Sequence, residues 1–215
     1  DINNRQWLKI KSTLGVLRII SFGNNPTEVP EEIILEPVGK NTASAIALAS
    51  LRALDISDES NLIVLSSDHI IQNESQFLEA VKCGLDFSFD NKIVTFGVIP
   101  DRPETGYGYM RKGKSKEEAV CSVEEFIEKP HKEIAQKYLD SGSYLWNSGM
   151  FVFQASSYLD ELNRSRPDTC QKIFDSMSTL KEEKDFVRVS RDLYKKIDSE
   201  SIDYACLLYT SPSPR

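Results

Sequence analysis

The chain has 215 residues, of which 40% are hydrophobic and 27% are charged, and its formal net charge at pH 7 is −7. These proportions are ordinary for a globular domain and unlike those of a disordered chain, which has too few apolar residues to bury a core. The acidic balance, without a long run of Lys and Arg, argues against nucleic acid as the main partner. No apolar run approaches the ~20 residues that a membrane-spanning helix needs, so no membrane partner is expected.

The cysteines are scattered and contain no CxxC pair; they are Cys83, Cys121, Cys170 and Cys206. This spacing favours reduced thiols over a disulfide framework. Because only two histidines accompany them, a zinc site of His and Cys ligands is not expected. No charged-then-apolar signal segment opens the chain. A cytoplasmic protein is therefore predicted.

The first part of the chain alternates short apolar strands with a helical pattern. A strand is predicted at 33–35, and an alanine-rich helix follows at 42–54. Asn41 or Thr42 is the expected N-cap of that helix, because a side-chain oxygen there can accept from a free backbone N–H. Residues 61–65 form a continuous apolar run, which is typical of a strand buried on both faces.

The alternation continues through the middle of the chain. The apolar residues of 74–87 have the spacing of one face of a helix. A second buried strand is predicted at 92–99, where Pro100 stops it, and a strand-like stretch follows at 123–127.

Helices and one further strand are predicted in the last part of the chain. Pro130 suits the first turn of a helix that runs to about Leu139 and ends at Gly142. A strand follows at 150–153. Two more helices are predicted, at 158–162 and 171–177. Buried strands that alternate with helices predict a three-layer α/β domain with a mostly parallel sheet.

Asp68 directly follows the buried strand at 61–65, in the segment Leu-Ser-Ser-Asp-His. Open α/β sheets bind ligands at the carboxyl ends of their strands. A carboxylate there could hold Mg²⁺, which prefers oxygen ligands and substrate phosphates. A helix or turn cap is an equally good interpretation from position alone.

Glu36 lies in the segment Leu-Glu-Pro-Val-Gly-Lys-Asn-Thr-Ala, between a strand end and a helix start. Its carboxylate could accept two hydrogen bonds from the ring N–H and the exocyclic amine of guanine. The free N–H groups of the helix start would suit an anion. Without further context, a simple capped turn is the favoured interpretation.

Three later segments carry polar or aromatic side chains next to predicted strands. Arg102 to Tyr109 holds two glycines, which allow close backbone approach, and two tyrosines, which give an apolar wall with a polar tip. Lys129 could neutralise a sugar phosphate, although surface ion pairs are commoner at such places. Asn147 offers both a donor and an acceptor to a sugar.

In their order, these segments resemble the mannose-1-phosphate guanylyltransferases of the sugar nucleotidyltransferase superfamily. The resemblance extends from about Ile33 to Ala205. It rests on the motifs LEPVGKNTA, LSSDH, TFGVIPDRPETGYGY, FIEKP, YLWNSGMF and SIDYA. It implies a Rossmann-like nucleotide-diphospho-sugar transferase fold and an enzyme that transfers GMP from GTP to mannose 1-phosphate. The products would be GDP-mannose and pyrophosphate, with Mg²⁺ as the cofactor.

The resemblance also implies a role for particular residues. Asp68 and Asp203 would hold the metal ion, and with Lys129, which would bind the sugar phosphate, they are the expected catalytic residues. The expected substrate-binding residues are Glu36, Asn41 and Thr42 near the guanine, and Gly106, Tyr107, Glu128 and Asn147 at the mannose. The resemblance is compatible with a homodimer.

Two departures from the family pattern affect the expected domain limits. Nothing in 1–32 matches the glycine-rich loop that holds the triphosphate in the family, so 1–205 is predicted to be a partial nucleotidyltransferase domain, incomplete at its N-terminus. Residues 206–215 leave the family pattern and are predicted to be a non-native tail. The fragment is therefore expected to be inactive alone.

Two alternatives to a mannose-1-phosphate guanylyltransferase stay open. One is a nucleotidyltransferase for another sugar 1-phosphate, which assays with glucose 1-phosphate and fucose 1-phosphate would separate. The other is a non-catalytic nucleotide-sugar-binding or regulatory homologue, which would keep the binding edge without the chemistry.

Overall fold

The computed structural model describes residues 7–13, 16–22, 31–66, 69–117, 119–183 and 186–207. The strands are β1 (Trp7–Thr13), β2 (Val16–Phe22), β3 (Glu31–Leu35), β4 (Asn61–Ser66), β5 (Val94–Val98), β6 (Tyr109–Glu117), β7 (Val120–Ile127), β8 (Tyr144–Gln154), β9 (Lys181–Glu183) and β10 (Phe186–Arg188). The helices are α1 (Thr42–Ile56), α2 (Glu74–Ser88), α3 (Lys132–Ser141), α4 (Ala155–Ser165), α5 (Pro167–Met177), α6 (Arg191–Tyr194) and the π-helical turn η2 (Asp203–Leu207).

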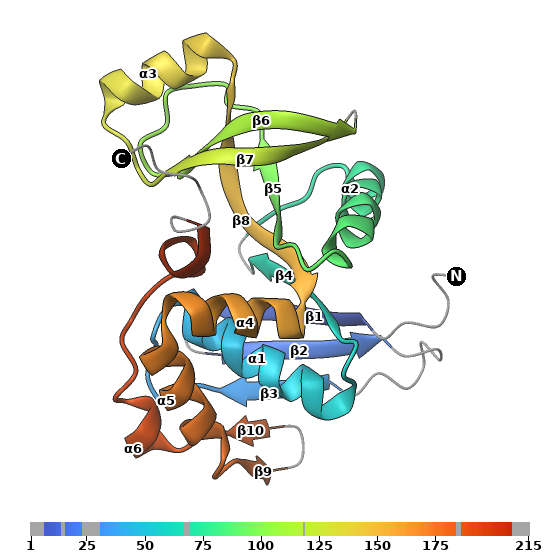
Figure 1. The fold of residues 1–215 in the computed structure, drawn as a ribbon, viewed down its shortest axis with the longest axis vertical. Coiled ribbons are helices and arrows are strands. Elements are labelled where there is room, and N and C mark those ends of the chain that lie inside the picture. The colour runs from blue at the N-terminus through green and yellow to red at the C-terminus, as the bar shows by residue number, and fades with distance from the viewer. Residues whose placement is uncertain are drawn as a thin grey trace.

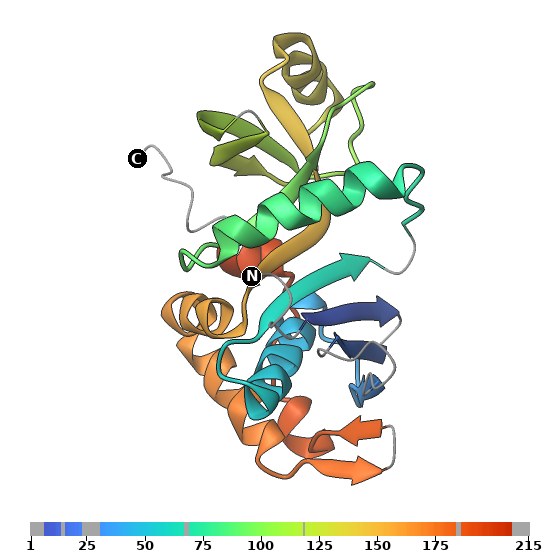
Figure 2. The same cartoon turned by 90° about the vertical axis from the view of Figure 1, so that its right-hand side faces the viewer.

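Helices cover both faces of the sheet around β4 and β8, which confirms the α/β class (Figures 1 and 2). Side chains alternate along β4: Leu62 belongs to the core under α1 and α4, whereas Ile63 packs with the core under α2. On β8, Phe151 belongs to the core under α1 and α4, and Val152 belongs to the core under α2. Successive side chains of a strand point to opposite faces, so a continuous apolar run is what a strand covered on both faces requires.

The prediction of a mostly parallel sheet is wrong. The strand order is β7-β6-β8-β4-β1-β2-β3-β10-β9, with β5 paired to β8 outside this path. Among the described strands, only β1 with β4 and β3 with β10 pair in parallel, and the other pairs are antiparallel. The main reason is β8, which pairs antiparallel with both β4 and β5 and so lies between the two strands that α2 connects. An apolar run indicates a buried strand but carries no information about its direction.

Local signals located most helix ends. Asn41 caps α1, its side chain accepting from the backbone N–H of Thr42 at 2.8 Å. Gly142 ends α3 in the left-handed conformation, with φ 64°. The helix itself begins at Lys132 instead of Pro130, because His131 is still extended and takes the N-cap position. The segments α4, α5 and β8 are longer in the structure than predicted, whereas β5 (Val94–Val98) is shorter than the predicted strand at 92–99.

The last described element, η2, contributes side chains to the main core. Cys206, in η2, is fully buried in the same core as α1 and α4, and burial raises the pKa of its thiol to about 12. Residues 208–215 of the predicted tail lie outside the described residues. The domain limits at 205 and 206 stay a prediction.

Candidate functional site

Asn147 and Asp203 form the centre of a polar cluster where β8 meets the start of η2. The side-chain amide nitrogen of Asn147 donates to Oδ1 of Asp203 at 2.7 Å. The backbone N–H of Asn147 donates to the carbonyl of Gly108 at 2.8 Å, which ties β8 to the loop before β6. Three segments far apart in the sequence therefore meet at Asn147.

A second carboxylate lies near Asp203. Burial raises the pKa of Asp203, and the negative charge of Glu128 raises it further, although the hydrogen bond from Asn147 opposes both effects. Lys129 Nζ lies 3.2 Å from Glu128 Oε1, and Lys129 has a positive φ of 46°. The cluster thus combines two carboxylates, one ammonium group and one amide, which is a set that can bind a sugar phosphate with a cation.

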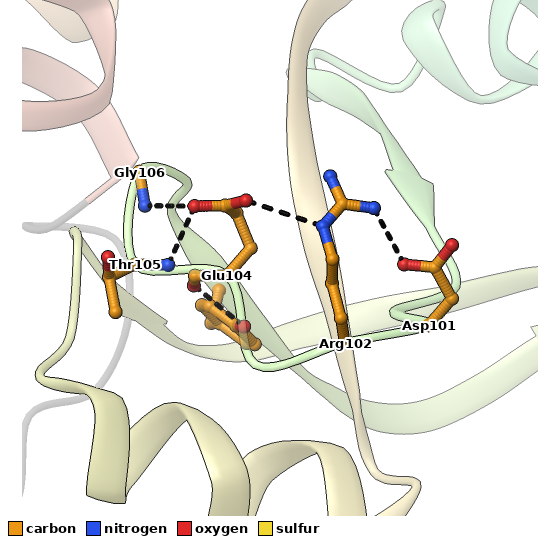
Figure 3. Close-up of polar contacts among 6 residues, drawn as sticks. Asp101, Arg102, Glu104, Thr105 and Gly106 are labelled. Atoms are coloured by element: carbon orange, nitrogen blue, oxygen red, sulfur yellow. Dashed lines mark hydrogen bonds and ion pairs between the residues drawn. The ribbon is translucent and has the colours of Figure 1, made fainter.

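The loop before β6 is held by Glu104 (Figure 3). Its Oε1 accepts from the backbone N–H groups of Thr105 and Gly106, each at 3.0 Å. Its other oxygen accepts from Arg102 at 3.4 Å. These contacts, with the bond from Gly106 as the largest cause, lower the pKa of Glu104. Figure 3 shows the carboxylate lying between the loop backbone and the guanidinium group.

Two side chains of this loop, Tyr107 and Arg102, pack against the ring of Trp146. The ring of Tyr107 meets it edge-on with centroids 5.3 Å apart, and the guanidinium group of Arg102 lies 5.1 Å from the ring centroid. The indole Nε1 is buried and has no hydrogen-bond partner among the described residues. Tyr107 stays 45% exposed, so its outer face is available to a ligand.

Gly108 is a position that the sequence analysis did not single out. A Cβ there would lie 2.8 Å from Glu128 Oε2 and 2.8 Å from the ring of Phe126. Gly106, the predicted glycine, has far more space, with its nearest atom at 3.4 Å. The close approach therefore belongs to the second glycine of the Gly-Tyr-Gly-Tyr segment, and the spacing alone did not distinguish the two.

The predicted guanine residues lie at the start of α1. Asn41 is occupied as the helix cap, with a φ of 69°. The hydroxyl of Thr42 accepts from the backbone N–H of Ile202 at 2.9 Å, and the backbone N–H of Ala43 donates to the carbonyl of Glu200 at 3.1 Å. The start of α1 is thus joined to the segment that leads directly into Asp203.

Glu36 is half-buried and accepts a hydrogen bond from the hydroxyl of Tyr194. Burial raises its pKa, and the bonds from Tyr194 and from the backbone at Lys40 oppose that shift. The Tyr194 hydroxyl also lies 3.0 Å from Ser44 Oγ. One carboxylate oxygen of Glu36 is therefore already engaged within the protein.

The segment 200–203 is fixed from a third side by Arg166. Its guanidinium group makes two hydrogen bonds to the carboxylate of Glu200, at 2.8 Å and 2.7 Å. Two parallel N–H···O bonds give this pairing a defined geometry. Sequence reasoning missed the pair, because its members lie 34 positions apart and no local pattern joins them.

The donor set suits a hard divalent cation. Mg²⁺ prefers oxygen ligands and is usually bound through one or two carboxylates together with substrate phosphates. Asp203 is a half-buried carboxylate beside the negative charge of Glu128, so a bound cation would reduce both the desolvation cost and the repulsion. No group of three or more His, Cys, Asp or Glu side chains within the described ranges could hold a metal ion. Asp68, the other predicted ligand, lies outside those ranges.

Of the predicted site residues, the structure brings together Glu128, Lys129, Asn147 and Asp203, with Gly106 and Tyr107 in the adjoining loop. Glu36, Asn41 and Thr42 form a separate group at α1, linked to the first group through 200–202. Their roles in binding stay predictions. No helix in the described part of the chain is both long and apolar enough to cross a membrane.

A family model described as nucleotidyl transferase matches residues 9–192. The chain is 44% identical over 190 residues to a mannose-1-phosphate guanylyltransferase of Escherichia coli K12, which covers 86% of this chain and 40% of that protein. It is 46% identical over 186 residues to the mannose-1-phosphate guanylyltransferase of Salmonella montevideo, covering 84% of this chain and 39% of that protein. The chain thus spans about two fifths of the length of these relatives.

Two solved structures are also similar. One is described as mannose-6-phosphate isomerase from Helicobacter pylori, with a TM-score of 0.73 and 35% identity over 81% of this chain and 67% of that chain. The other is described as mannose-1-phosphate geranyltransferase from Thermus thermophilus, with a TM-score of 0.71 and 30% identity over 82% of this chain and 49% of that chain.

Proposed function

Because the chain belongs to the nucleotidyl transferase family, we propose that it carries the sugar-phosphate side of a mannose-1-phosphate guanylyltransferase. The reaction transfers GMP from GTP to mannose 1-phosphate and gives GDP-mannose and pyrophosphate. The observation that carries the proposal is the cluster of Asn147, Asp203, Glu128 and Lys129. It provides hydrogen-bonding groups for sugar hydroxyls, the ammonium group of Lys129 for the phosphate, and the half-buried carboxylate of Asp203 for a metal ion.

Each residue of the cluster has a chemical task in this proposal. Glu128 and Asn147 bind mannose hydroxyls, and the ammonium group of Lys129 binds the sugar phosphate. Tyr107 and Gly106 line the same site. Asp203, together with Asp68, would hold Mg²⁺. Carboxylates, an amide and an ammonium group can between them recognise both ends of a sugar 1-phosphate.

The transfer itself depends on positioning more than on covalent participation of the protein. An oxygen of mannose 1-phosphate attacks the α-phosphorus of GTP in line, and pyrophosphate leaves. Both reactants are anions, so the residues must orient them and offset their repulsion. Lys129 does so at the sugar phosphate, and bound Mg²⁺ would supply further charge neutralisation. In this proposal, the guanine base of GTP is bound by Glu36, Asn41 and Thr42.

Binding of mannose 1-phosphate to this chain tests the proposal. In a calorimetric titration with Mg²⁺ present, Lys129→Met is expected to weaken binding at least about tenfold, which corresponds to about 1.4 kcal/mol. Lys137→Met is the matched control, because Lys137 is exposed on α3 and should leave binding unchanged. Equal affinity of both variants and the wild type would contradict the assignment of Lys129.

Further assays distinguish the two alternatives, which are another sugar 1-phosphate as substrate and a non-catalytic homologue. A preference for glucose 1-phosphate or fucose 1-phosphate would assign the site to another sugar. A non-catalytic homologue, assayed as the full-length protein, would bind GDP-mannose but release no pyrophosphate from GTP and mannose 1-phosphate. Asp68→Asn in the full-length protein is expected to abolish Mg²⁺-dependent turnover while leaving the fold intact.

A further inference from the structure

An irregularity in strand pairing lies directly beside Asn147. Thr95 of β5 pairs with Phe151 of β8, whereas Gly97 pairs with Asn147. Three residues of β8 therefore lie opposite a single residue of β5, and one of the three, Gly149, has a φ of +67°. Such bulges are frequent next to active sites, where they redirect a side chain. Here Asn147 is the paired residue of β8 that directly precedes the bulge.

The hydroxyl of Thr95 lies beside this bulge. It lies 3.0 Å from Oδ1 of Asn147 and 3.2 Å from the backbone carbonyl of Met150. The hydroxyl has one proton, so it donates to one of these two acceptors, and Oδ1 of Asn147 is the nearer. The backbone N–H of Gly149 donates to the same Asn147 oxygen at 3.3 Å. Two donors thus converge on the amide oxygen of Asn147 from one side.

This arrangement decides which way the amide of Asn147 faces. An amide has an acceptor end and a donor end of nearly the same shape, so its hydrogen-bond partners decide between two orientations. With Oδ1 held by Thr95 and Gly149, Nδ2 faces Asp203 at 2.7 Å. The opposite orientation would set Oδ1 against a carboxylate, which has no proton to donate when it is ionised.

We propose that Thr95 is a positioning residue, which fixes the amide of Asn147 so that one N–H holds Asp203 and the other is presented to the sugar 1-phosphate. The sugar-binding part of this inference rests on the function proposed above. Thr95 needs no contact with the substrate for this role. Its β-branched shape suits a strand, and Val would keep that shape while removing the hydroxyl donor.

The first test needs no ligand. The side-chain amide signals of Asn147 are assigned by NMR from their loss in Asn147→Asp. In the wild type and in Thr95→Ser, solvent exchange of these protons should be equally slow. In Thr95→Val, it should be at least about threefold faster, because one of the two donors that hold Oδ1 is gone. Unchanged exchange in Thr95→Val would overturn the positioning role.

The second test measures the consequence for binding. The dissociation constant for mannose 1-phosphate in Mg²⁺ should rise about tenfold in Thr95→Val and stay within about twofold of the wild type in Thr95→Ser. Thr169→Val, which removes a buried hydroxyl on α5, is the control for a general loss of packing and should bind like the wild type. If the wild type binds but Thr95→Val binds equally well, the inference is wrong. If the wild type does not bind, the proposed function fails, and the exchange rates still decide whether Thr95 positions Asn147.

Discussion

Asn147 and Asp203 lie 56 positions apart in the chain, and the amide of the first donates a 2.7 Å hydrogen bond to the carboxylate of the second. Asn147 belongs to β8, whereas Asp203 follows a segment that is bonded to the start of α1. The carboxylate therefore lies where the central sheet and the first helix meet. Its position depends on contacts from both.

Asp203→Asn is expected to stabilise the fold at neutral pH. Burial raises the pKa of Asp203 above its ordinary value of 3.8, so the folded state binds a proton at this carboxylate more tightly than the unfolded state does. That stability is fully present below the unfolded-state pKa and is lost as the pH rises through the folded-state pKa. Asn is neutral throughout and keeps the acceptor for Asn147, so at pH 7 the free energy of unfolding should rise by on the order of 1 kcal/mol.

Urea unfolding at pH 7 and pH 4 checks this expectation. The gain should shrink toward pH 4, where Asp203 itself is increasingly protonated. Asp140→Asn on the exposed face of α3 is the control and should change stability by less than about 0.5 kcal/mol. An Asp203→Asn variant that is less stable than the wild type at pH 7 would be the opposite of what burial of the carboxylate predicts.

Gly108→Ala and Gly106→Ala should behave differently although the residues are two positions apart. The added Cβ at 108 would lie 2.8 Å from Glu128 Oε2 and from the buried ring of Phe126, whereas at 106 the nearest atom is 3.4 Å away. Overpacking of this kind typically costs about 1–3 kcal/mol. Thermal unfolding should therefore show a lower midpoint for Gly108→Ala and a midpoint near the wild type for Gly106→Ala. Equal midpoints would show that Glu128 and Phe126 move aside freely.

Tyr194→Phe should destabilise the fold in a pH-dependent way. The variant removes the hydroxyl that donates to the half-buried Glu36, and a buried acceptor that loses its donor costs about 1–3 kcal/mol. The pKa of Glu36 is already raised by burial and should rise further in the variant. The loss of stability is therefore expected to be largest at pH 7 and smaller at pH 4, where Glu36 takes up a proton.

Tyr158→Phe is the matched control for Tyr194→Phe. The buried hydroxyl of Tyr158 donates to the backbone carbonyl of Ala43 at 2.8 Å. A carbonyl does not titrate, so the loss of stability in this variant should be the same at both pH values. A pH-independent loss in Tyr194→Phe as well would mean that Glu36 does not depend on Tyr194 for its charge.

Sequence reasoning succeeded where the signal is local. The cap at Asn41 and the left-handed end at Gly142 depend on neighbouring residues only, and both are found as predicted. The continuous apolar run of β4 correctly indicated burial on both faces. Strand direction failed, because β8 enters between β4 and β5 from a distant part of the chain.

Some residues of the candidate site were predicted from the sequence, and others were found only in the structure. The family resemblance assigned Glu128 and Asn147 to the mannose and Asp203 to the metal ion, and these side chains lie close together in the structure, although their roles stay predictions. Thr95 and Gly108 were not predicted, since their importance arises from a bulge in β8 and from the close approach of Glu128. Such features depend on pairing register and packing distance, which single-sequence patterns do not report.

A crystal of the protein soaked with Mn²⁺ and mannose 1-phosphate tests the central claim most directly, because the anomalous signal of Mn²⁺ locates the cation without reference to turnover. A peak is expected within coordination distance of the Asp203 carboxylate, about 2.0–2.2 Å, as hard divalent ions bind oxygen. The sugar phosphate should lie beside Lys129 with its hydroxyls toward Asn147 and Glu128. A peak at another carboxylate, with Asp203 still bonded only to the protein, would contradict the claim that this cluster is the sugar-phosphate side of a nucleotidyltransferase site.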